Sequence, residues 1–320
     1  MRQLGLAGSR RYGRGRLLRR WAACALLLVP LGHAASHAAI EQPRPLEARI
    51  GEQLTGFAGT VSVYARNLDS GREFALQADR RVRTASTIKL PIACALAAEV
   101  AAGRARWEER LQIRGEDKVS GSGVLSEFTV GETVSLRDAL TLMIVVSDNT
   151  ATNLILDRIS ADRVNEFMAS QGFEETRSMR KIRGDGTQLK PAEGWSREGE
   201  KPDSKRFGIG ASTPREMVRL LERLEQGKIV DAATSRELLA VLERQQYKDG
   251  IGRKTGELRV ASKSGSLDAL RSDVGVVYTP AGRIAIAITV DDLPAIDYSP
   301  DNVGNRLISA LTQILLEELK

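Results

Sequence analysis

Strand-forming segments lie near both ends of this 320-residue chain, and helix-forming segments fill the middle. Near the amino-terminal end, two short apolar stretches flank the turn-like sequence Asn67-Leu68-Asp69-Ser70-Gly71, which predicts a β-hairpin. The predicted strands are 61–65, 72–76, 258–264, 273–278 and 283–290. A chain that returns to its first strands after a long helical stretch favours one sheet interrupted by an inserted helical unit.

Several of the helical segments begin at capping residues. Ser135 and Asp138 resemble a capping box, and Thr213 precedes a proline at the first helical position. The predicted helices are 86–102, 136–143, 151–159, 161–170, one beginning at 214, 234–242 and a last one with its apolar face at 303, 307, 311, 314 and 315. Between Thr176 and Gly210 no apolar period is present, so we expect a long irregular loop of the kind that often carries function.

The first 38 residues have the composition of a secretory signal peptide. Seven arginines and no acidic residue accompany an apolar run from Trp21 to Leu31, and small residues follow up to Ala38. The apolar run is roughly half of the ~20 residues that a spanning helix needs. We therefore expect cleavage near Ala38, a periplasmic or secreted location, and no stable membrane anchor afterwards. Cleavage takes the formal net charge from +6 to −1, so the basic composition does not indicate a nucleic-acid partner.

The chain that remains after cleavage contains no histidine, because His33 and His37 are the only two. A Ser-His-Asp triad and a His-ligated zinc site are therefore excluded, and we expect no metal and no other cofactor. Cys94 is then the single cysteine, so no intramolecular disulfide can form, and its apolar surroundings predict a place in the core. A serine hydrolase of this composition needs a base other than histidine.

Ser86 and Lys89 are a candidate nucleophile and base. Positions i and i+3 lie on one helix face, and an amine whose pKa is lowered by desolvation or by nearby positive charge can act as a base. The N–H groups at the helix start favour an oxyanion beside the serine. The same four-residue pattern recurs at Ser178 and Lys181, inside the predicted loop, so the pattern alone is weak.

Two further motifs strengthen this assignment. Ser147-Asp148-Asn149 falls between two predicted helices, as an exposed turn would. Lys263-Ser264-Gly265-Ser266 ends a predicted strand, and its glycine permits close approach of a substrate to the strand edge. Lys254-Thr255-Gly256 has a similar pattern but precedes the strand, so we assign the motif to Lys263.

The three motifs, in this order, resemble those of class A β-lactamases and of the wider group of penicillin-recognising serine enzymes. The resemblance extends from about residue 50 to the end of the chain. It implies an antiparallel sheet of about five strands flanked by helices, with an inserted all-helical subdomain. The expected boundaries are 1–38 for the signal peptide, 39–83 plus 211–320 for the α/β subdomain, and 84–210 for the helical subdomain with its irregular loop at 176–210.

The resemblance also implies catalytic roles. Ser86 would attack the substrate carbonyl with Lys89 beside it. Ser147 would pass a proton to the leaving nitrogen, and Lys263 would hold Ser147 and the substrate carboxylate electrostatically.

The remaining site residues would bind substrate. Asn149 would hydrogen-bond the substrate's side-chain amide, and the backbone N–H of Ser266 would form an oxyanion hole with that of Ser86. Ser264 and Gly265 belong to the same strand motif. Arg271, on the next strand, either binds the substrate carboxylate or is a surface arginine.

One segment of the class A pattern is missing. Those enzymes carry a Glu-x-x-Leu-Asn segment that holds the water for hydrolysis of the acyl-enzyme, and residues 176–210 offer only Glu193, Glu198 and Glu200 without that context. We therefore expect a β-lactam hydrolase that acts through acyl-Ser86 with a slow second step. A D-alanyl-D-alanine peptidase or related penicillin-binding protein, and a sensor that stays acylated, remain open. The expected partner is a small molecule, either a β-lactam or a peptidoglycan-like peptide, and we expect a monomer.

Overall fold

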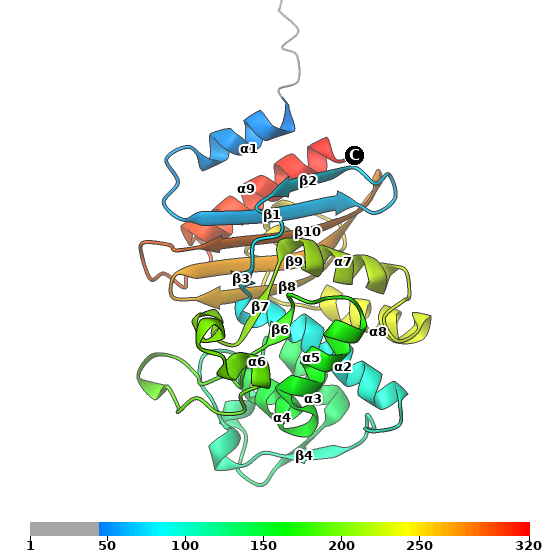
Figure 1. Ribbon diagram of the computed structural model, residues 1–320, viewed down its shortest axis with the longest axis vertical. Helices are drawn as coiled ribbons and strands as arrows, with labels where there is room; N and C mark the ends of the chain where they lie inside the picture. Colours follow the sequence, from blue (N-terminus) through cyan, green and yellow to red (C-terminus); the bar gives the residue numbers. More distant parts are fainter. Residues whose placement is uncertain (1–44) are drawn as a thin grey trace, which may run out of the picture. The chain divides into compact units, whose positions relative to one another are not determined.

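The computed structural model describes residues 45–320 (Figure 1). The signal peptide predicted at residues 1–38 lies outside this range. Among the described residues, no helix combines the length and the apolar character needed to cross a bilayer.

A five-stranded antiparallel sheet brings the two ends of the described chain together. Its strands are β1 (Thr60–Asn67), β2 (Glu73–Leu76), β8 (Val260–Leu267), β9 (Leu270–Thr279) and β10 (Gly282–Asp291). They lie in the order β2-β1-β10-β9-β8, so the first hairpin joins the last three strands through β1 and β10. This confirms the predicted sheet and leaves β8, with its Lys263 motif, at an edge.

Helices cover both faces of the sheet (Figure 1). On one face α9 (Val303–Glu318) packs on β9 and β10 with α1 (Leu46–Leu54) beside it, and on the other α7 (Pro214–Glu225) and α8 (Ala232–Glu243) contact the sheet. Side chains alternate between these faces along each strand. Val274 belongs to the core on the α7–α8 side, and Lys263 is its cross-strand partner. Lys263 therefore points to that side.

Helix α2 (Lys89–Ala101) lies inside the helical layer. It contacts the helices α3 (Leu136–Val145), α4 (Asn149–Ile159), α5 (Ala161–Ser170) and α8. A helix that is apolar all round is buried, and Leu90, Ile92 and Leu96 are at most 1% exposed. Cys94 is a buried free thiol in this core, as predicted. The start of α2, where Lys89 lies, is thus held from all sides.

The prediction of an irregular loop over 176–210 is wrong in part. β6 (Arg177–Ser178) pairs with β7 (Gly210–Ser212), which also pairs with β3 (Val82–Arg83). The short helix α6 (Arg197–Glu200) begins where Ser196 Oγ accepts a hydrogen bond from the N–H of Gly199. Strands this short cannot show an apolar period in the sequence. The segments with which they pair lie far away along the chain, so no local pattern predicts the pairing.

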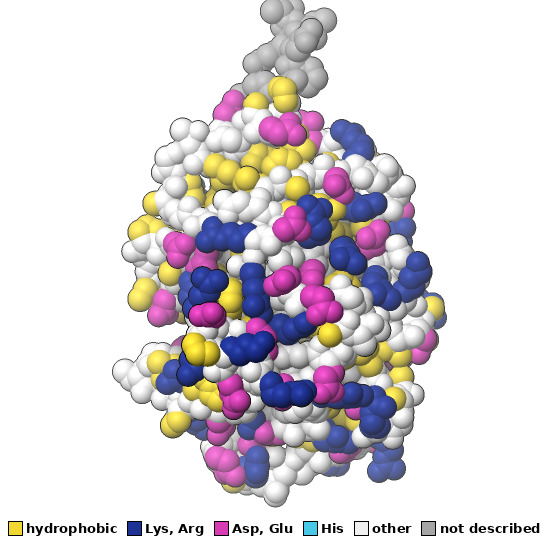
Figure 2. All heavy atoms as spheres, viewed as in Figure 1, with side chains coloured by type: hydrophobic (Ala, Val, Ile, Leu, Met, Phe, Trp, Pro, Cys, Tyr) yellow, Lys and Arg dark blue, Asp and Glu magenta, His cyan; other side chains and the backbone are white. Residues whose placement is uncertain are grey.

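A second small sheet joins β4 (Arg110–Gln112) to β5 (Thr133–Ser135). The described residues cluster as one compact unit, so the division into an α/β and a helical subdomain stays a prediction. On the face drawn in Figure 2, basic and acidic side chains are interleaved rather than gathered by sign.

Candidate active site

The candidate nucleophile lies on a 3₁₀ turn, Ala85–Ile88, that leads directly into α2. Ser86 is half-buried there. The preceding residue, Ala85, has φ 46°, in the left-handed region that a residue with a Cβ rarely adopts. Strained backbone of this kind clusters at functional sites. It turns the chain sharply between β3 and the helix at the serine.

Strand β8 runs against this turn because Gly265 has no side chain. A Cβ at Gly265 would lie 2.8 Å from the N of Ser86, 2.8 Å from the carbonyl oxygen of Thr84 and 3.0 Å from the N of Thr87. From the sequence we expected a substrate to approach the strand edge at Gly265. In the structure, the backbone of residues 84–87, which we call the nucleophile turn, lies against this glycine. Ser86 and the Lys263 motif are therefore neighbours, although they are far apart in sequence.

Lys89 is completely buried beneath the site. Its Nζ lies 2.6 Å from the carbonyl oxygen of Ser147, 3.1 Å from Ser147 Oγ and 2.8 Å from Asn149 Oδ1. Burial lowers the pKa of Lys89 well below its ordinary value, and the charge of Lys263 lowers it further against the opposing effect of Asp148. A neutral amine can donate to the two carbonyl-type oxygens and accept the proton of the Ser147 hydroxyl.

The Ser147-Asp148-Asn149 turn is held in place by its middle residue. Asp148 accepts hydrogen bonds from the backbone N–H of Val124 (2.6 Å), Leu125 (2.8 Å) and Ala151 (2.8 Å), and the last of these caps α4. Ser147 has φ 54°, a second left-handed backbone at the site. The turn therefore presents its two outer side chains to Lys89 in a fixed geometry.

Lys263 is also completely buried, on the edge strand. Its Nζ donates to the carbonyl oxygen of Ser264 at 2.7 Å and lies 3.3 Å from Gln245 Oε1. Burial lowers the pKa of Lys263 to about 7, opposed by the charge of Asp273. This ammonium is poised to lose its proton near neutral pH.

Arg271 does not join this group, so its expected role as a carboxylate ligand is a wrong interpretation. Its side chain lies toward α9, since a Cβ at Gly304 would be 3.0 Å from Arg271 Cγ. Its guanidinium donates to the carbonyl oxygens of Leu267, Leu270 and Asp297. The alternation of side chains along β9 puts it on the face away from Lys263. It is a buried arginine that fixes loops, and neither of the two expected roles describes it.

The two competing motif matches lie elsewhere in the fold. Ser178 is in β6, with a fully buried side chain. Lys254 is exposed and precedes β8. Neither reaches the turn that carries Ser86 in any contact the described residues make.

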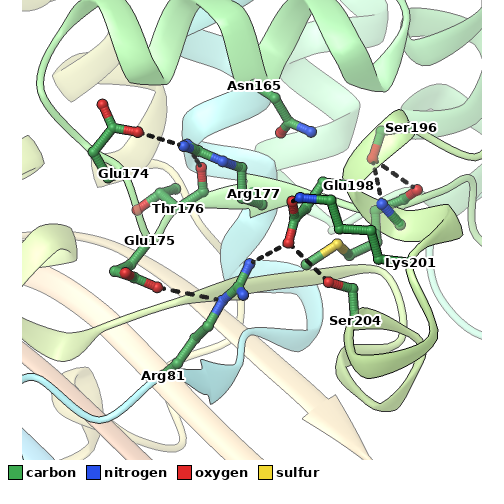
Figure 3. A network of polar contacts seen from close by, with 12 residues as sticks. Arg81, Asn165, Glu174, Glu175, Thr176, Arg177, Ser196, Glu198, Lys201 and Ser204 are labelled. Carbon is green, nitrogen blue, oxygen red and sulfur yellow. Dashed lines mark hydrogen bonds and ion pairs between the residues drawn. The ribbon is translucent and has the colours of Figure 1, made fainter.

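The glutamates of the 176–210 segment make other contacts, and Figure 3 shows those of Glu198. Glu198 lies 3.2 Å from Arg81, 2.8 Å from Lys201 and 2.8 Å from Ser204 Oγ. The Lys201 contact in particular lowers the pKa of Glu198 to about 2. Glu193 lies 3.6 Å from Lys181, and Glu200 is exposed. A carboxylate held ionised by two cations is a weak base for activating water.

Two residues of the site environment, Gln245 and Asn153, were not assigned from the sequence. Gln245 contacts Lys263 and Ser264. Asn153, one helical turn after Asn149, holds both the N–H and the carbonyl oxygen of Ile182 at 2.8 Å each. Gln245 belongs to no local pattern, and the contact of Asn153 with Ile182 joins residues far apart in the sequence, so only tertiary contacts reveal both roles.

The described residues contain no group of three or more His, Cys, Asp and Glu side chains that could hold a metal ion.

Comparison with known proteins identifies the family of the chain. β-Lactamase L2 of Stenotrophomonas maltophilia is 26% identical over 235 residues, which cover 72% of this chain and 72% of that protein. The crystal structure of a β-lactamase from Sphaerobacter thermophilus is 32% identical and aligns with a TM-score of 0.73, over 85% of this chain and 95% of that one. PBP-A is 26% identical with a TM-score of 0.70, over 85% and 94% of the two chains. The profile of the Beta-lactamase enzyme family matches residues 45–319, and the chain belongs to that family.

Proposed function

We propose that this protein is a serine hydrolase that opens the amide of β-lactams through an acyl-Ser86 intermediate. The observation that carries the proposal is the buried Lys89 amine, which lies 3.1 Å from Ser147 Oγ and begins α2 directly after the 3₁₀ turn that holds Ser86. Family membership supports a hydrolase acting on β-lactams. The position of Ser86 three residues before the buried Lys89 supports a serine mechanism.

Acylation follows from these groups. The Oγ of Ser86 attacks the β-lactam carbonyl carbon, and its proton passes to the neutral amine of Lys89. Ser147 Oγ, 3.1 Å from that amine, passes a proton on to the ring nitrogen as the carbon–nitrogen bond breaks. The product is an ester between Ser86 and the opened substrate.

The edge strand supplies the binding groups. The N–H of Ser264 points away from β9, because it donates to Gln245, and N–H groups alternate in direction along a strand. The N–H of Ser266 therefore points to the same free edge, where with the N–H of Ser86 it would bind the oxyanion. Lys263 and Ser264 Oγ would bind the substrate carboxylate.

None of the glutamates of the 176–210 segment is an evident base for the second step. The glutamates of the 176–210 segment are bound to cations or exposed, and no described carboxylate contacts Lys89 or Ser86. Hydrolysis of the acyl-enzyme would then be slow, since a general base typically contributes about 10²–10⁴-fold. This observation also favours a second candidate, a penicillin-binding peptidase or sensor. A mutant of the related PBP-A has been solved as an acyl-enzyme complex with penicillin G.

Stopped-flow hydrolysis of a chromogenic cephalosporin tests the proposal. We expect a burst of product whose amplitude approaches the enzyme concentration, followed by slow turnover. A burst with no turnover would assign the chain to the peptidase or sensor group. Fast hydrolysis without a burst would contradict the account of the second step, and no reaction at all would contradict the acyl-Ser86 proposal.

A further inference from the structure

A buried glutamine lies beside Lys263. Gln245 is 1% exposed, and its Oε1 lies 2.7 Å from the N of Ser264, 3.0 Å from Ser264 Oγ and 3.3 Å from Lys263 Nζ. Its Nε2 donates to Ser262 Oγ at 2.8 Å. One side chain thus contacts three successive residues of the edge strand. The orientation of the amide is fixed, because a backbone N–H can only donate and therefore needs the oxygen of Gln245.

The glutamine is itself held firmly. It follows the end of α8, and its backbone N–H donates to the carbonyl oxygen of Leu242. α8 packs on β8 and α7. The Gln245 side chain extends from the end of a packed helix, and both its amide oxygen and its amide nitrogen form hydrogen bonds to β8. It can therefore transmit the position of α8 to the edge strand.

The charged groups around Lys263 matter as much as the position of its side chain. The charged groups that act on Lys263 or share its surroundings are Lys89 from α2, Asp148 from the turn before α4 and Asp273 from β9, with Lys248 acting on Asp273. Asp273 accepts from the N–H of Ile251, on the α9 side of the sheet, and no described carboxylate forms an ion pair with Lys263. Gln245 is neutral, so it accepts a hydrogen bond from the ammonium without cancelling its charge.

We infer that Gln245 is a positioning residue that aims Lys263 and Ser264 at the substrate carboxylate while leaving the positive charge of Lys263 uncompensated. The inference rests on the proposed function for the identity of the substrate. A carboxylate at position 245 would still accept hydrogen bonds from Ser264 and Lys263, and the Ser262 hydroxyl would become the donor of the third, but the carboxylate would compete with the substrate for the ammonium. An apolar residue would remove the acceptor from both Lys263 and Ser264.

Acylation kinetics with a matched pair of substrates test this inference. Penicillin G and its methyl ester differ only in the carboxylate that Lys263 would bind. For Gln245→Glu we expect the second-order acylation rate constant for penicillin G to fall by about 10- to 100-fold, chiefly through weaker binding, and that for the ester to stay nearly unchanged. Gln245→Asn, which keeps an amide on a shorter stem, should recover part of the loss. Gln246→Glu, on the exposed neighbouring residue, is the control and should leave both rates unchanged.

The titration of Lys263 provides a readout that does not depend on activity. In protein with ¹³C-labelled lysine, with the Lys263 signal assigned by Lys263→Met, Gln245→Glu should raise the pKa of Lys263 above its value of about 7, and Gln246→Glu should not. The alkaline limb of penicillin G acylation should move upward with it. Circular dichroism confirms that each variant is folded.

The proposed function and the role of Gln245 can be contradicted separately. If the parent chain reacts with neither substrate, the proposed function is wrong, and the Lys263 titration still decides the role of Gln245. If Gln245→Glu leaves that titration unchanged, or slows the ester as much as penicillin G, the inference about Gln245 is overturned.

Discussion

Gly265 offers the sharpest structural perturbation of the site. Replacing it with alanine adds one methyl group, whose carbon would lie 2.8 Å from the N of Ser86, 2.8 Å from the Thr84 carbonyl oxygen and 3.0 Å from the N of Thr87. All three neighbours are backbone atoms of the nucleophile turn. No flexible side chain can move aside, so either the turn or β8 must shift.

The required shift can be estimated from these distances. Ordinary contacts of a Cβ begin near 3.4 Å, so the nearest atoms must separate by roughly half an ångström. The displaced atoms include the N–H of Ser86, which would bind the oxyanion. A misplacement of about 1 Å can cost about 10²-fold in rate, and we expect Gly265→Ala to acylate about 10- to 100-fold more slowly. Some stability is lost as well, since overpacking typically costs about 1–3 kcal/mol.

The assay is the rate of covalent labelling by a fluorescent penicillin, with the fold monitored by circular dichroism. Gly51→Ala is the matched control, because nothing lies within 4 Å of the added methyl group and Gly51 belongs to helix α1. That variant should label at the parent rate and gain about 0.5–1 kcal/mol in stability. If Gly265→Ala is labelled at the parent rate, acylation does not require the close packing of β8 on the nucleophile turn, and this reasoning is refuted.

Two further substitutions test other parts of the account. Lys263→Met should slow acylation yet raise the free energy of unfolding by about 1–4 kcal/mol at pH 6. Because burial lowers the pKa of Lys263 in the folded protein from 10.5 to about 7, this gain in stability should be full below pH 7 and fade toward pH 10.5. A loss of stability in urea titrations at pH 6 would contradict this prediction. Glu198→Gln should leave deacylation unchanged but lower the free energy of unfolding at pH 7 by about 1–2 kcal/mol. Since the folded pKa of Glu198 is depressed to about 2, that difference should vanish as pH falls from 4.5 toward 2, and slower deacylation of this variant would make Glu198 the missing base.

The sheet and the long helices could be predicted because their signals are local. Alternating apolar residues marked β1 and β10, and the capping serine at position 135 and threonine at position 213 marked the starts of α3 and α7. The short strands β3, β6 and β7 could not be predicted, because their pairing joins residues 82–83 to residues far along the chain.

The site divides in the same way. Ser86, Lys89, Ser147 and Lys263 stand in recognisable motifs, and the structure places the first two on one turn and brings Lys89 to Ser147. The left-handed backbone at Ala85 gave no signal, since alanine does not favour it. Gln245 gave none either, because its amide contacts a strand that lies later in the sequence.

Arg271 illustrates the opposite error. Its position near the Lys263 motif suggested a substrate ligand, but neighbouring positions on a strand point to opposite faces. Its guanidinium is occupied by three backbone carbonyl oxygens. The sequence correctly placed Arg271 on the strand that follows the Lys263 motif, but it did not show that its side chain lies on the opposite face of the sheet from Lys263.

The central claim is that Ser86 forms a covalent ester with a β-lactam. Intact-mass spectrometry of the purified protein after a brief exposure to penicillin G, followed by peptide mapping, tests it most directly. We expect one added penicillin per chain, located on the peptide that contains Ser86, no adduct on Ser86→Ala, and an unchanged adduct on Ser178→Ala. An adduct that persists in Ser86→Ala, or maps to another residue, would contradict the account.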